Sequence, residues 1–423
     1  MQDKDAAYLA WIGDSISGRG AVTRHGAKER CYAERRERTP ECLVYCRRRV
    51  LCSVNCTMTR LTIITDLDGT LLPRPFGTVG ASAHPNLSTG PAYAPLVALL
   101  NAGATVIGVT GSTLATHKVR FYDELPLEHR RAGRVLLAVQ TGSTLYRGSA
   151  ADGEPLVDTE FTAYLAKHVA IRLTDAVVTA LIDEGRAGIR RFFADLECNP
   201  SLVDPSGSLA YLLDCSANEI PVTTDGKRVP RIEVREGNSA VVFVGVPSSL
   251  GARYFKVPSA VAGAVDGRPT GRVCFDCVPR GLNKSIVVRY LLASGLVSSG
   301  VAFALGDQPL GNDEGLTRWH RNAEHDIPFV SVSERVDMVQ EWLRECWITS
   351  CSNDSASAVL FSALAQYLTK DGALVQQLTT DVLSDIVHRL NEETPQPSPR
   401  HNGSEQTDSH NEVTALDQSQ SIK

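Results

Sequence analysis

Short apolar runs alternate with amphipathic stretches along most of the chain after residue 60. Residues 93–102 have the apolar spacing of a helix, and an amphipathic helix is predicted after residue 332, to about residue 346. Apolar strands that alternate with helices predict an α/β fold, with a parallel sheet covered by helices on both faces. The runs with the length and aliphatic character of buried strands are residues 61–65, 106–109, 135–139, 301–305 and 329–332.

The middle of the chain, about residues 150–272, has a different pattern. Turn-forming pairs such as Asp204-Pro205 and Asp225-Gly226 separate its segments. This mixture of helices and strands predicts an α+β domain inserted into the sheet domain. The helices are predicted over residues 161–173 and 176–184, and the strands over residues 209–214, 232–235 and 240–244.

Two further segments follow toward the carboxyl end. Leucines at helical spacing predict a helical extension over residues 347–391. Residues 392–423 are polar and contain closely spaced prolines, so they cannot bury enough apolar surface to order themselves. We expect a disordered tail there.

The first 57 residues are basic and rich in cysteine. They carry 11 lysine and arginine residues against 7 acidic ones, a net charge of +4, which leaves −9 on the rest of the chain. The pairs Cys42–Cys46 and Cys52–Cys56 could form a zinc cluster, but the spacing is loose and no histidine lies among them. We therefore favour a poorly ordered extension, with Met58 as the functional start.

Composition and charge exclude several classes of protein. The hydrophobic share of 43% and the charged share of 22% are ordinary for a soluble globular chain. No apolar run approaches the roughly 18–20 residues of a membrane-spanning helix, and the acidic body lacks the basic surface that nucleic acid requires. The odd number of cysteines and the lack of a charged-then-apolar leader lead us to expect a reducing, cytoplasmic location.

The sharpest chemical signal follows the first predicted strand, where the sequence is Asp66-Leu67-Asp68-Gly69-Thr70. Two carboxylates this close together repel each other unless a cation lies between them. Mg²⁺, a hard ion that prefers oxygen ligands, would resolve that repulsion. For an isolated pair of aspartates, an acidic turn without function would be the simpler interpretation.

This segment resembles the first motif of the haloacid dehalogenase (HAD) superfamily of phosphotransferases, a strand followed by DxDGT. The resemblance implies that Asp66 is a nucleophile that becomes transiently phosphorylated. It implies that Asp68 is the general acid and base, which protonates the leaving oxygen and then takes a proton from water. It also implies a Mg²⁺ ion held by the carboxylate of Asp66 and the main-chain carbonyl of Asp68.

Thr110-Gly111-Ser112, after the second predicted strand, resembles the second motif of this family. The resemblance implies that the hydroxyl and the adjacent backbone amides bind the transferring phosphoryl group. The same triplet is common at the start of a helix, and Ser112 could serve in both ways.

Lys284 precedes a predicted helix and resembles the third motif. A lysine at a helix N-terminus is disfavoured by the macrodipole, so a bound anion would explain its presence. A solvated surface lysine is the alternative.

Gly306-Asp307 and Asn312-Asp313 follow another strand and resemble the fourth motif, with a loop about two residues longer than is common. The resemblance implies that Asp307 is a metal ligand. It leaves open whether Asp313, Asn312 or a water molecule completes the metal shell. The longer loop is similar to that of the phosphomannomutase branch.

The spacing of the motifs suits a family member with an inserted domain. About 174 residues separate Thr110 from Lys284, far more than one βαβ unit of about 30 residues needs. The resemblance, which covers roughly residues 60–346, implies a Rossmann-like core and a C2-type cap of the C2B form. The core would comprise residues 58–149 and 273–346, and the cap residues 150–272.

Two other patterns carry no chemistry. Cys274 and Cys277 lie in a predicted strand, where positions three apart face opposite sides, which argues against a redox pair. Neither a dinucleotide-binding motif nor a P-loop motif is present.

Three functions remain open from the sequence. The first is a Mg²⁺-dependent phosphatase that acts on a phosphorylated small molecule, with a sugar phosphate favoured. The second is a sugar phosphomutase, and the third is a non-catalytic binding or regulatory module. The oligomeric state is open as well. Arg190, Arg191, Arg231 and Lys256 are basic candidates for binding a second anionic group of the substrate, or for a solvated cap surface.

Overall fold

The computed structural model describes residues 61–73, 85–207, 209–223, 229–298, 300–370 and 378–393. The predictions for the first 57 residues, including the zinc cluster and the start at Met58, lie outside these ranges, as does nearly all of the polar tail. No helix within the described ranges is long and apolar enough to cross a membrane.

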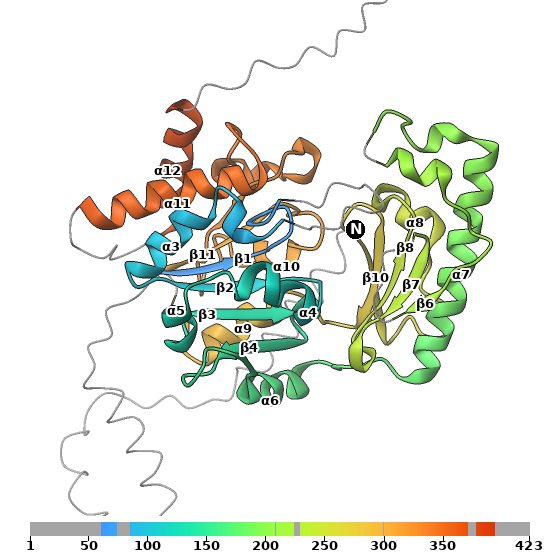
Figure 1. The fold of residues 1–423 in the computed structure, drawn as a ribbon, viewed down its shortest axis with the longest axis horizontal. Coiled ribbons are helices and arrows are strands. Elements are labelled where there is room, and N and C mark those ends of the chain that lie inside the picture. Colours follow the sequence, from blue (N-terminus) through green and yellow to red (C-terminus); the bar gives the residue numbers. More distant parts are fainter. Residues whose placement is uncertain are drawn as a thin grey trace, which may run out of the picture. The chain divides into compact units, whose positions relative to one another are not determined.

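A seven-stranded sheet organises the first layer of the fold, in the order β12-β11-β1-β2-β3-β4-β5 (Figure 1). Its first five strands are parallel, and β4 and β5 extend one edge in antiparallel pairing. The strands are β1 (Thr62–Thr65), β2 (Thr105–Val109), β3 (Val135–Val139), β4 (Thr144–Gly148), β5 (Pro155–Val157), β11 (Ala302–Gly306) and β12 (Phe329–Ser331). The predicted α/β class and all five apolar strands are confirmed, each within one residue at either end.

Side chains alternate between two hydrophobic layers across this sheet. Ile63 enters one layer and the next residue, Ile64, enters the other. The first layer is covered by α3 (Tyr93–Asn101), α11 (Asn353–Lys370) and α12 (Thr380–Glu393), and the second by α6 (Thr159–His168) and α9 (Ser285–Ala293). The strand runs are apolar throughout because both faces of the sheet are buried.

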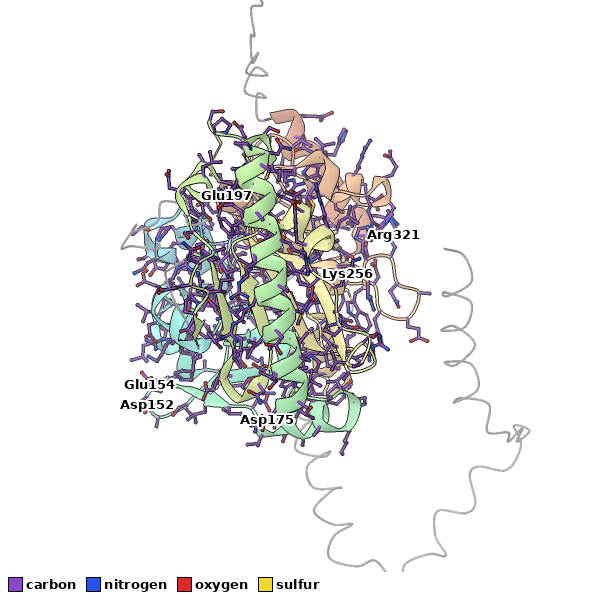
Figure 2. All side chains as sticks on the ribbon, turned by 90° about the vertical axis from the view of Figure 1, so that its right-hand side faces the viewer. Asp152, Glu154, Asp175, Glu197, Lys256 and Arg321 are labelled. Atoms are coloured by element: carbon purple, nitrogen blue, oxygen red, sulfur yellow. The ribbon has the colours of Figure 1, made fainter. Side chains whose placement is uncertain are left out.

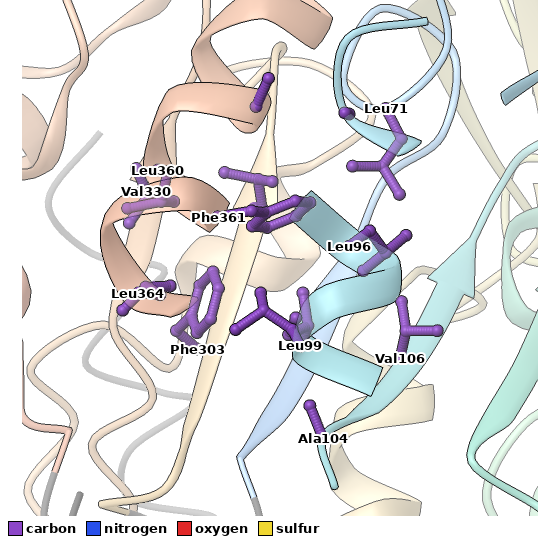
Figure 3. Packing of buried hydrophobic residues seen from close by; sticks show 14 of the residues in the cluster. Leu71, Leu96, Leu99, Ala104, Val106, Phe303, Val330, Leu360, Phe361 and Leu364 are labelled. Atoms are coloured by element: carbon purple, nitrogen blue, oxygen red, sulfur yellow. The ribbon is translucent and has the colours of Figure 1, made fainter. Parts of the chain in front are cut away.

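The carboxyl-terminal helices belong to the hydrophobic core. Phe361 of α11 packs among Leu96 and Leu99 of α3 and Phe303 of β11 (Figure 3). Burial of a side chain of this size contributes about 1.5–3 kcal/mol relative to exposure. The segment predicted as a helical extension contains α11 and α12, and it completes one layer of the sheet domain.

A second sheet has five strands in the order β6-β7-β8-β10-β9. The strands are β6 (Val222–Thr223), β7 (Arg231–Val234), β8 (Val241–Val244), β9 (Val265–Thr270) and β10 (Cys274–Pro279). The long helix α7 (Asp175–Cys198) packs on this sheet and presents charged residues such as Asp175 and Glu197 to solvent (Figure 2). The α+β character predicted for the middle of the chain is thus observed.

Two strands cross the expected limits of the inserted segment. β5 lies inside residues 150–272 but pairs with β4 of the first sheet. β10 lies beyond residue 272 but pairs with β8 and β9 of the second sheet. The chain therefore passes from the first sheet to the second near residue 158 and returns to the first near residue 280.

Two predicted elements are wrong. The strand expected over residues 209–214 is a 3₁₀ helix, η5 (Ala210–Asp214), in which Leu212 alone is fully buried. The amphipathic helix expected before residue 346 is two 3₁₀ segments, η8 (Val336–Met338) and η9 (Glu341–Cys346). A bridge between Ser331 and Trp347 returns the chain to the sheet after these two segments.

Short helical segments connect the main elements. They are η1 (Leu87–Thr89), α4 (Leu114–His117), the π-helical turn η2 (Lys118–Tyr122), α5 (Leu127–Arg131), η3 (Gln140–Gly142), η4 (Pro200–Leu202), η6 (Glu236–Asn238), η7 (Ser248–Leu250), α8 (Gly251–Tyr254) and α10 (Glu314–Thr317).

Candidate functional site

The carboxyl ends of three neighbouring parallel strands meet at one edge of the first sheet. β1 lies between β2 and β11, so the polar segments that follow these strands come together. A cavity of about 430 Å³ opens at this edge. From the sequence-predicted set, its lining includes Asp66, Asp68, Thr110, Gly111, Ser112, Lys284 and Asn312.

Three buried aspartates form a cluster beside the cavity. One carboxylate oxygen each from Asp66, Asp307 and Asp313 lies within 4.8 Å of the others. Asp313 Oδ2 accepts a hydrogen bond from the backbone N–H of Gln308 at 3.0 Å. Glycine is required at position 306, because a Cβ there would lie 2.5 Å from Asp313 Oδ2.

Lys284 connects two of these aspartates. Its Nζ lies 2.5 Å from Asp66 Oδ1 and 2.7 Å from Asp313 Oδ1. Its side chain is 0% exposed, so the alternative of a solvated surface lysine is wrong. Burial acts against the ammonium charge, but the carboxylates of Asp313 and Asp66 outweigh burial and raise the pKa of Lys284.

The aspartate cluster has more negative than positive charge. Burial raises the pKa of Asp66 to about 7; the Asp313 carboxylate adds to this rise, and Lys284 opposes it. Three carboxylates face one ammonium, and all four groups are buried. An oxygen donor set with a deficit of positive charge fits a hard divalent cation such as Mg²⁺.

Asp68 lies at the cavity wall between two basic side chains. Arg120 Nη1 donates to Asp68 Oδ1 at 2.8 Å, and His117 Nε2 lies 3.0 Å from Asp68 Oδ2. The Asp68 side chain is 32% exposed, and its enclosure by the cavity works to raise its pKa. His117 and then Arg120 outweigh that effect and hold the pKa of Asp68 well below its usual range.

Thr110 contacts both Ser112, another phosphate-binding candidate, and His117, one of the two basic residues beside Asp68. Its Oγ1 accepts a hydrogen bond from the Ser112 backbone N–H at 3.1 Å and lies 3.0 Å from His117 Nε2. The following helix, α4, has Thr113 at its N-cap, so the alternative in which Ser112 begins the helix is wrong. Thr110, Gly111 and Ser112 all line the cavity.

The loop after β11 separates the two residues that were alternatives for the last metal position. Asp313 joins the acidic cluster, whereas Asn312 lines the cavity. The Oδ1 atom of Asn312 is buried and has no hydrogen-bond donor among the described residues. Asn312 is thus available to a molecule in the cavity.

The opposite wall of the cavity belongs to the second sheet. Of the basic candidates, only Arg231 lines it. Arg191 lies elsewhere, bound to Glu184 at 2.7 Å, and Lys256 is exposed on the surface seen in Figure 2. The residues of this wall are Arg231, Glu233, Arg235, Val242, Arg268, Thr270, Gly271, Arg272, Val273, Cys274 and Asp276, with Leu209 and Tyr211 beside them.

Sequence reasoning missed most of this wall, although a signal was present. Arg231, Glu233 and Arg235 alternate along one strand, as do Cys274 and Asp276 along another. Polar residues at every second position of a strand place their side chains on the same face of the sheet. His117 and Arg120, which were also missed, lie three residues apart, at helical spacing.

Cys274 and Cys277 face opposite sides of β10. Cys274 lines the cavity, and Cys277 packs in the hydrophobic core under α7. Burial raises the pKa of both thiols, that of Cys274 to about 12. The argument against a redox pair is therefore confirmed.

Neither a family model nor a curated protein matches this sequence. Solved structures match distantly. The IMP-nucleotidase of Plasmodium falciparum is 11% identical, with a TM-score of 0.40 over 65% of this chain and 67% of that one. The sucrose-phosphatase of Synechocystis, solved with sucrose and phosphate, is 15% identical, with a TM-score of 0.38 over 73% of this chain and 98% of that one.

A haloacid dehalogenase-like hydrolase from Bacteroides thetaiotaomicron is 13% identical, with a TM-score of 0.39 over 73% of this chain and 100% of that one. Similarities with TM-scores this low carry no argument, and the arrangement of side chains in the cavity is the evidence that bears on function.

Proposed function

We propose that this protein is a HAD-type phosphohydrolase that cleaves a phosphate monoester of a small metabolite, with a sugar phosphate favoured. The observation that carries the proposal is the contact of Lys284 with both Asp66 and Asp313. These residues come from three distant segments, each of which resembles a different motif of one catalytic family. Their convergence beside a cavity supports a common chemical role.

In the first step, Asp66 attacks phosphorus through a carboxylate oxygen. The new bond joins that oxygen to phosphorus, and the bond from phosphorus to the ester oxygen breaks. Asp68 delivers a proton to the departing oxygen, which leaves as an alcohol. Asp68 is ionised in the arrangement described here, and the negative charge of a bound phosphate would favour its protonation.

In the second step, Asp68 accepts a proton from water as the water oxygen attacks phosphorus. The bond between phosphorus and Asp66 breaks, which releases inorganic phosphate and restores the Asp66 carboxylate. Water and ester are thereby converted to alcohol and phosphate, with Asp68 again carrying the proton that the next cycle uses.

The remaining residues bind and neutralise the phosphoryl group. The Thr110 hydroxyl and the backbone amide of Gly111 would donate hydrogen bonds to its oxygens, with Ser112 and Asn312 beside them. Lys284 would offset its charge. The carboxylates of Asp66, Asp307 and Asp313 and the main-chain carbonyl of Asp68 would hold Mg²⁺, which supplies charge neutralisation when bound.

Substitution of Asp66 tests the proposal. Asp66→Asn keeps the size of the side chain but removes the nucleophile, so we expect it to abolish phosphate release from a panel of sugar phosphates and other monoesters in the presence of Mg²⁺. The matched control is Glu197→Gln, an exposed carboxylate on α7. Turnover by Asp66→Asn at the wild-type rate would refute the proposal.

A sugar phosphomutase is the second candidate, favoured by the long loop from Gly306 to Asp313, from which Gln308 and Asn312 line the cavity. A mutase would pass the phosphoryl group from Asp66 to a second sugar hydroxyl in place of water. Phosphorus NMR of a sugar 1-phosphate distinguishes the two. A 6-phosphate without free phosphate indicates a mutase, and free phosphate indicates a hydrolase.

A further inference from the structure

The second-sheet wall of the cavity has an excess of positive charge. Four arginines and two acids line it, which leaves a formal charge of +2. The Asp66 and Lys284 side chains line the same cavity. The six charged residues are Arg231, Arg235, Arg268, Arg272, Glu233 and Asp276.

One of the two acids is already shared by two arginines. Glu233 is buried, and its carboxylate lies 2.5 Å from Arg231 Nη2 and 2.7 Å from Arg235 Nη2. The other acid, Asp276, lies directly opposite Arg268 on the adjacent strand. Glu233 therefore holds two of the guanidinium groups in place, and the two acids together cannot balance all four.

Several donors on this wall have no acceptor. The Nε and Nη2 atoms of Arg268, Nε of Arg235 and Nη1 of Arg272 are buried without a hydrogen-bond partner among the described residues. Buried N–H groups of a charged side chain are costly to leave unsatisfied. A planar guanidinium suits the oxygens of a carboxylate or phosphate, which it binds in a bidentate manner.

We propose that this arginine wall, formed by Arg235, Arg268 and Arg272 with Arg231, binds a second anionic group of the substrate. The inference rests on the proposed function: the phosphate monoester lies at Asp66, and a carboxylate or a second phosphate on the same molecule faces the arginines. A cavity of about 430 Å³ is within the size range of small-metabolite sites. A neutral sugar phosphate would leave the arginine donors unsatisfied.

Matched substrate pairs test this selectivity. The pairs are glucose 6-phosphate with 6-phosphogluconate, which adds a carboxylate, and fructose 6-phosphate with fructose 1,6-bisphosphate, which adds a phosphate. With the full chain and Mg²⁺, we expect kcat/KM to be at least tenfold higher for the acidic member of one pair. The pair that shows this difference in kcat/KM indicates whether the second anionic group is a carboxylate or a phosphate. Equal kcat/KM within both pairs would overturn the inference.

Substitutions in the wall connect this preference to the arginines. Arg268→Gln and Arg272→Gln should each lower kcat/KM for the acidic member at least tenfold more than for the neutral member, mainly through KM. Arg268→Lys keeps the charge but loses the bidentate geometry. Its kcat/KM for the acidic member should lie between those of wild type and Arg268→Gln. Lys256→Gln removes an exposed cation that does not line the cavity and serves as the control. Equal losses for both members in both glutamine variants would refute the assignment.

Binding to the Asp66→Asn variant separates this inference from the proposed function. Calorimetric titration of that variant with each pair requires no turnover. Tighter binding of an acidic member supports the arginine wall even if wild-type protein hydrolyses nothing, in which case the proposed function alone fails. Hydrolysis of both members without any difference in affinity overturns the arginine wall alone.

Discussion

At the scale of single residues, Asp68 is the group whose surroundings were least expected. Arg120 and His117 each contact one of its two carboxylate oxygens, and His117 also contacts the Thr110 hydroxyl. These contacts fix the direction of the carboxylate relative to the segment that follows β2. We interpret Arg120 and His117 as positioning residues, because they act through Asp68 and Thr110.

Leaving-group dependence tests the role of Arg120. Arg120→Met should lower kcat for a sugar phosphate by about tenfold to hundredfold, because under the proposed mechanism a misplaced Asp68 cannot protonate the alkoxide. The loss should be much smaller for p-nitrophenyl phosphate, whose leaving group needs no proton. Initial rates with both substrates distinguish a positioning role from a loss of folding, because a loss of folding would reduce both rates alike.

The buried carboxylate of Asp66 predicts a pH dependence of stability in metal-free protein. Burial raises its pKa from 3.8 to about 7, so the folded state retains a proton that the unfolded chain releases. The free energy of unfolding should therefore fall as the pH rises from about 4 to about 7. Asp66→Asn should lack this contribution, and Mg²⁺ should reduce it in wild type.

Urea unfolding in a chelating buffer, repeated with Mg²⁺, measures these slopes. A metal-free wild type whose stability changes with pH no differently from that of Asp66→Asn would contradict the interpretation.

At the scale of elements, the packing of α7 depends on two glycines. A Cβ at Gly188 would press against the ring of Phe255, which follows α8, and would lie 2.7 Å from the Tyr254 carbonyl oxygen of α8. A Cβ at Gly185 would meet the Phe243 ring of β8. Glycine is unfavourable inside a helix by about 1 kcal/mol relative to alanine. The close approach of α7 to α8 and to the second sheet explains why this cost is accepted.

Gly188→Ala should destabilise the protein by about 1–3 kcal/mol, the usual cost of overpacking, in spite of the better helix propensity of alanine. Thermal unfolding followed by circular dichroism measures this. Arg190→Ala, an exposed position on the same helix, should change little. A more stable Gly188→Ala variant would show that α7 and α8 can move apart at little cost.

At the scale of the whole molecule, segments distant in sequence share one core. The carboxyl-terminal α11 packs beside α3 on the first sheet (Figure 3), and Ser357 of α11 donates a hydrogen bond to the Thr70 carbonyl oxygen at 2.6 Å. This helix therefore supports the loop that carries Asp66 and Asp68. Residues beyond the motif-bearing region are part of the structure that holds the site.

Phe361→Ala should lower the free energy of unfolding by about 3–5 kcal/mol, because a fully buried ring is replaced by a cavity. Chemical denaturation measures the loss. Leu156→Ala, at a largely exposed position, is the control and should change the free energy by less than about 0.5 kcal/mol. Equal stability of the two variants would mean that α11 contributes little to the core.

The sequence by itself determined the parallel sheet and the segments that follow its strands. Both faces of the central strands are buried, so their apolar runs are unambiguous, and the polar residues after β1, β2 and β11 had to meet at one edge. The same reasoning failed for the strand expected over residues 209–214 and for the helix expected after residue 332, to about residue 346, where a few apolar side chains satisfy a 3₁₀ turn as well as a strand or helix.

Only the tertiary structure decided which charged groups face one another. Lys284 contacts Asp66 across 218 positions of sequence, and Arg120 contacts Asp68 across 52. Contacts of this kind depend on how strands and loops are brought together, which local spacing does not specify. Apart from Arg231, the arginine wall was likewise hidden, because a charged side chain on a strand is as compatible with solvent as with a cavity until the opposite wall is in place.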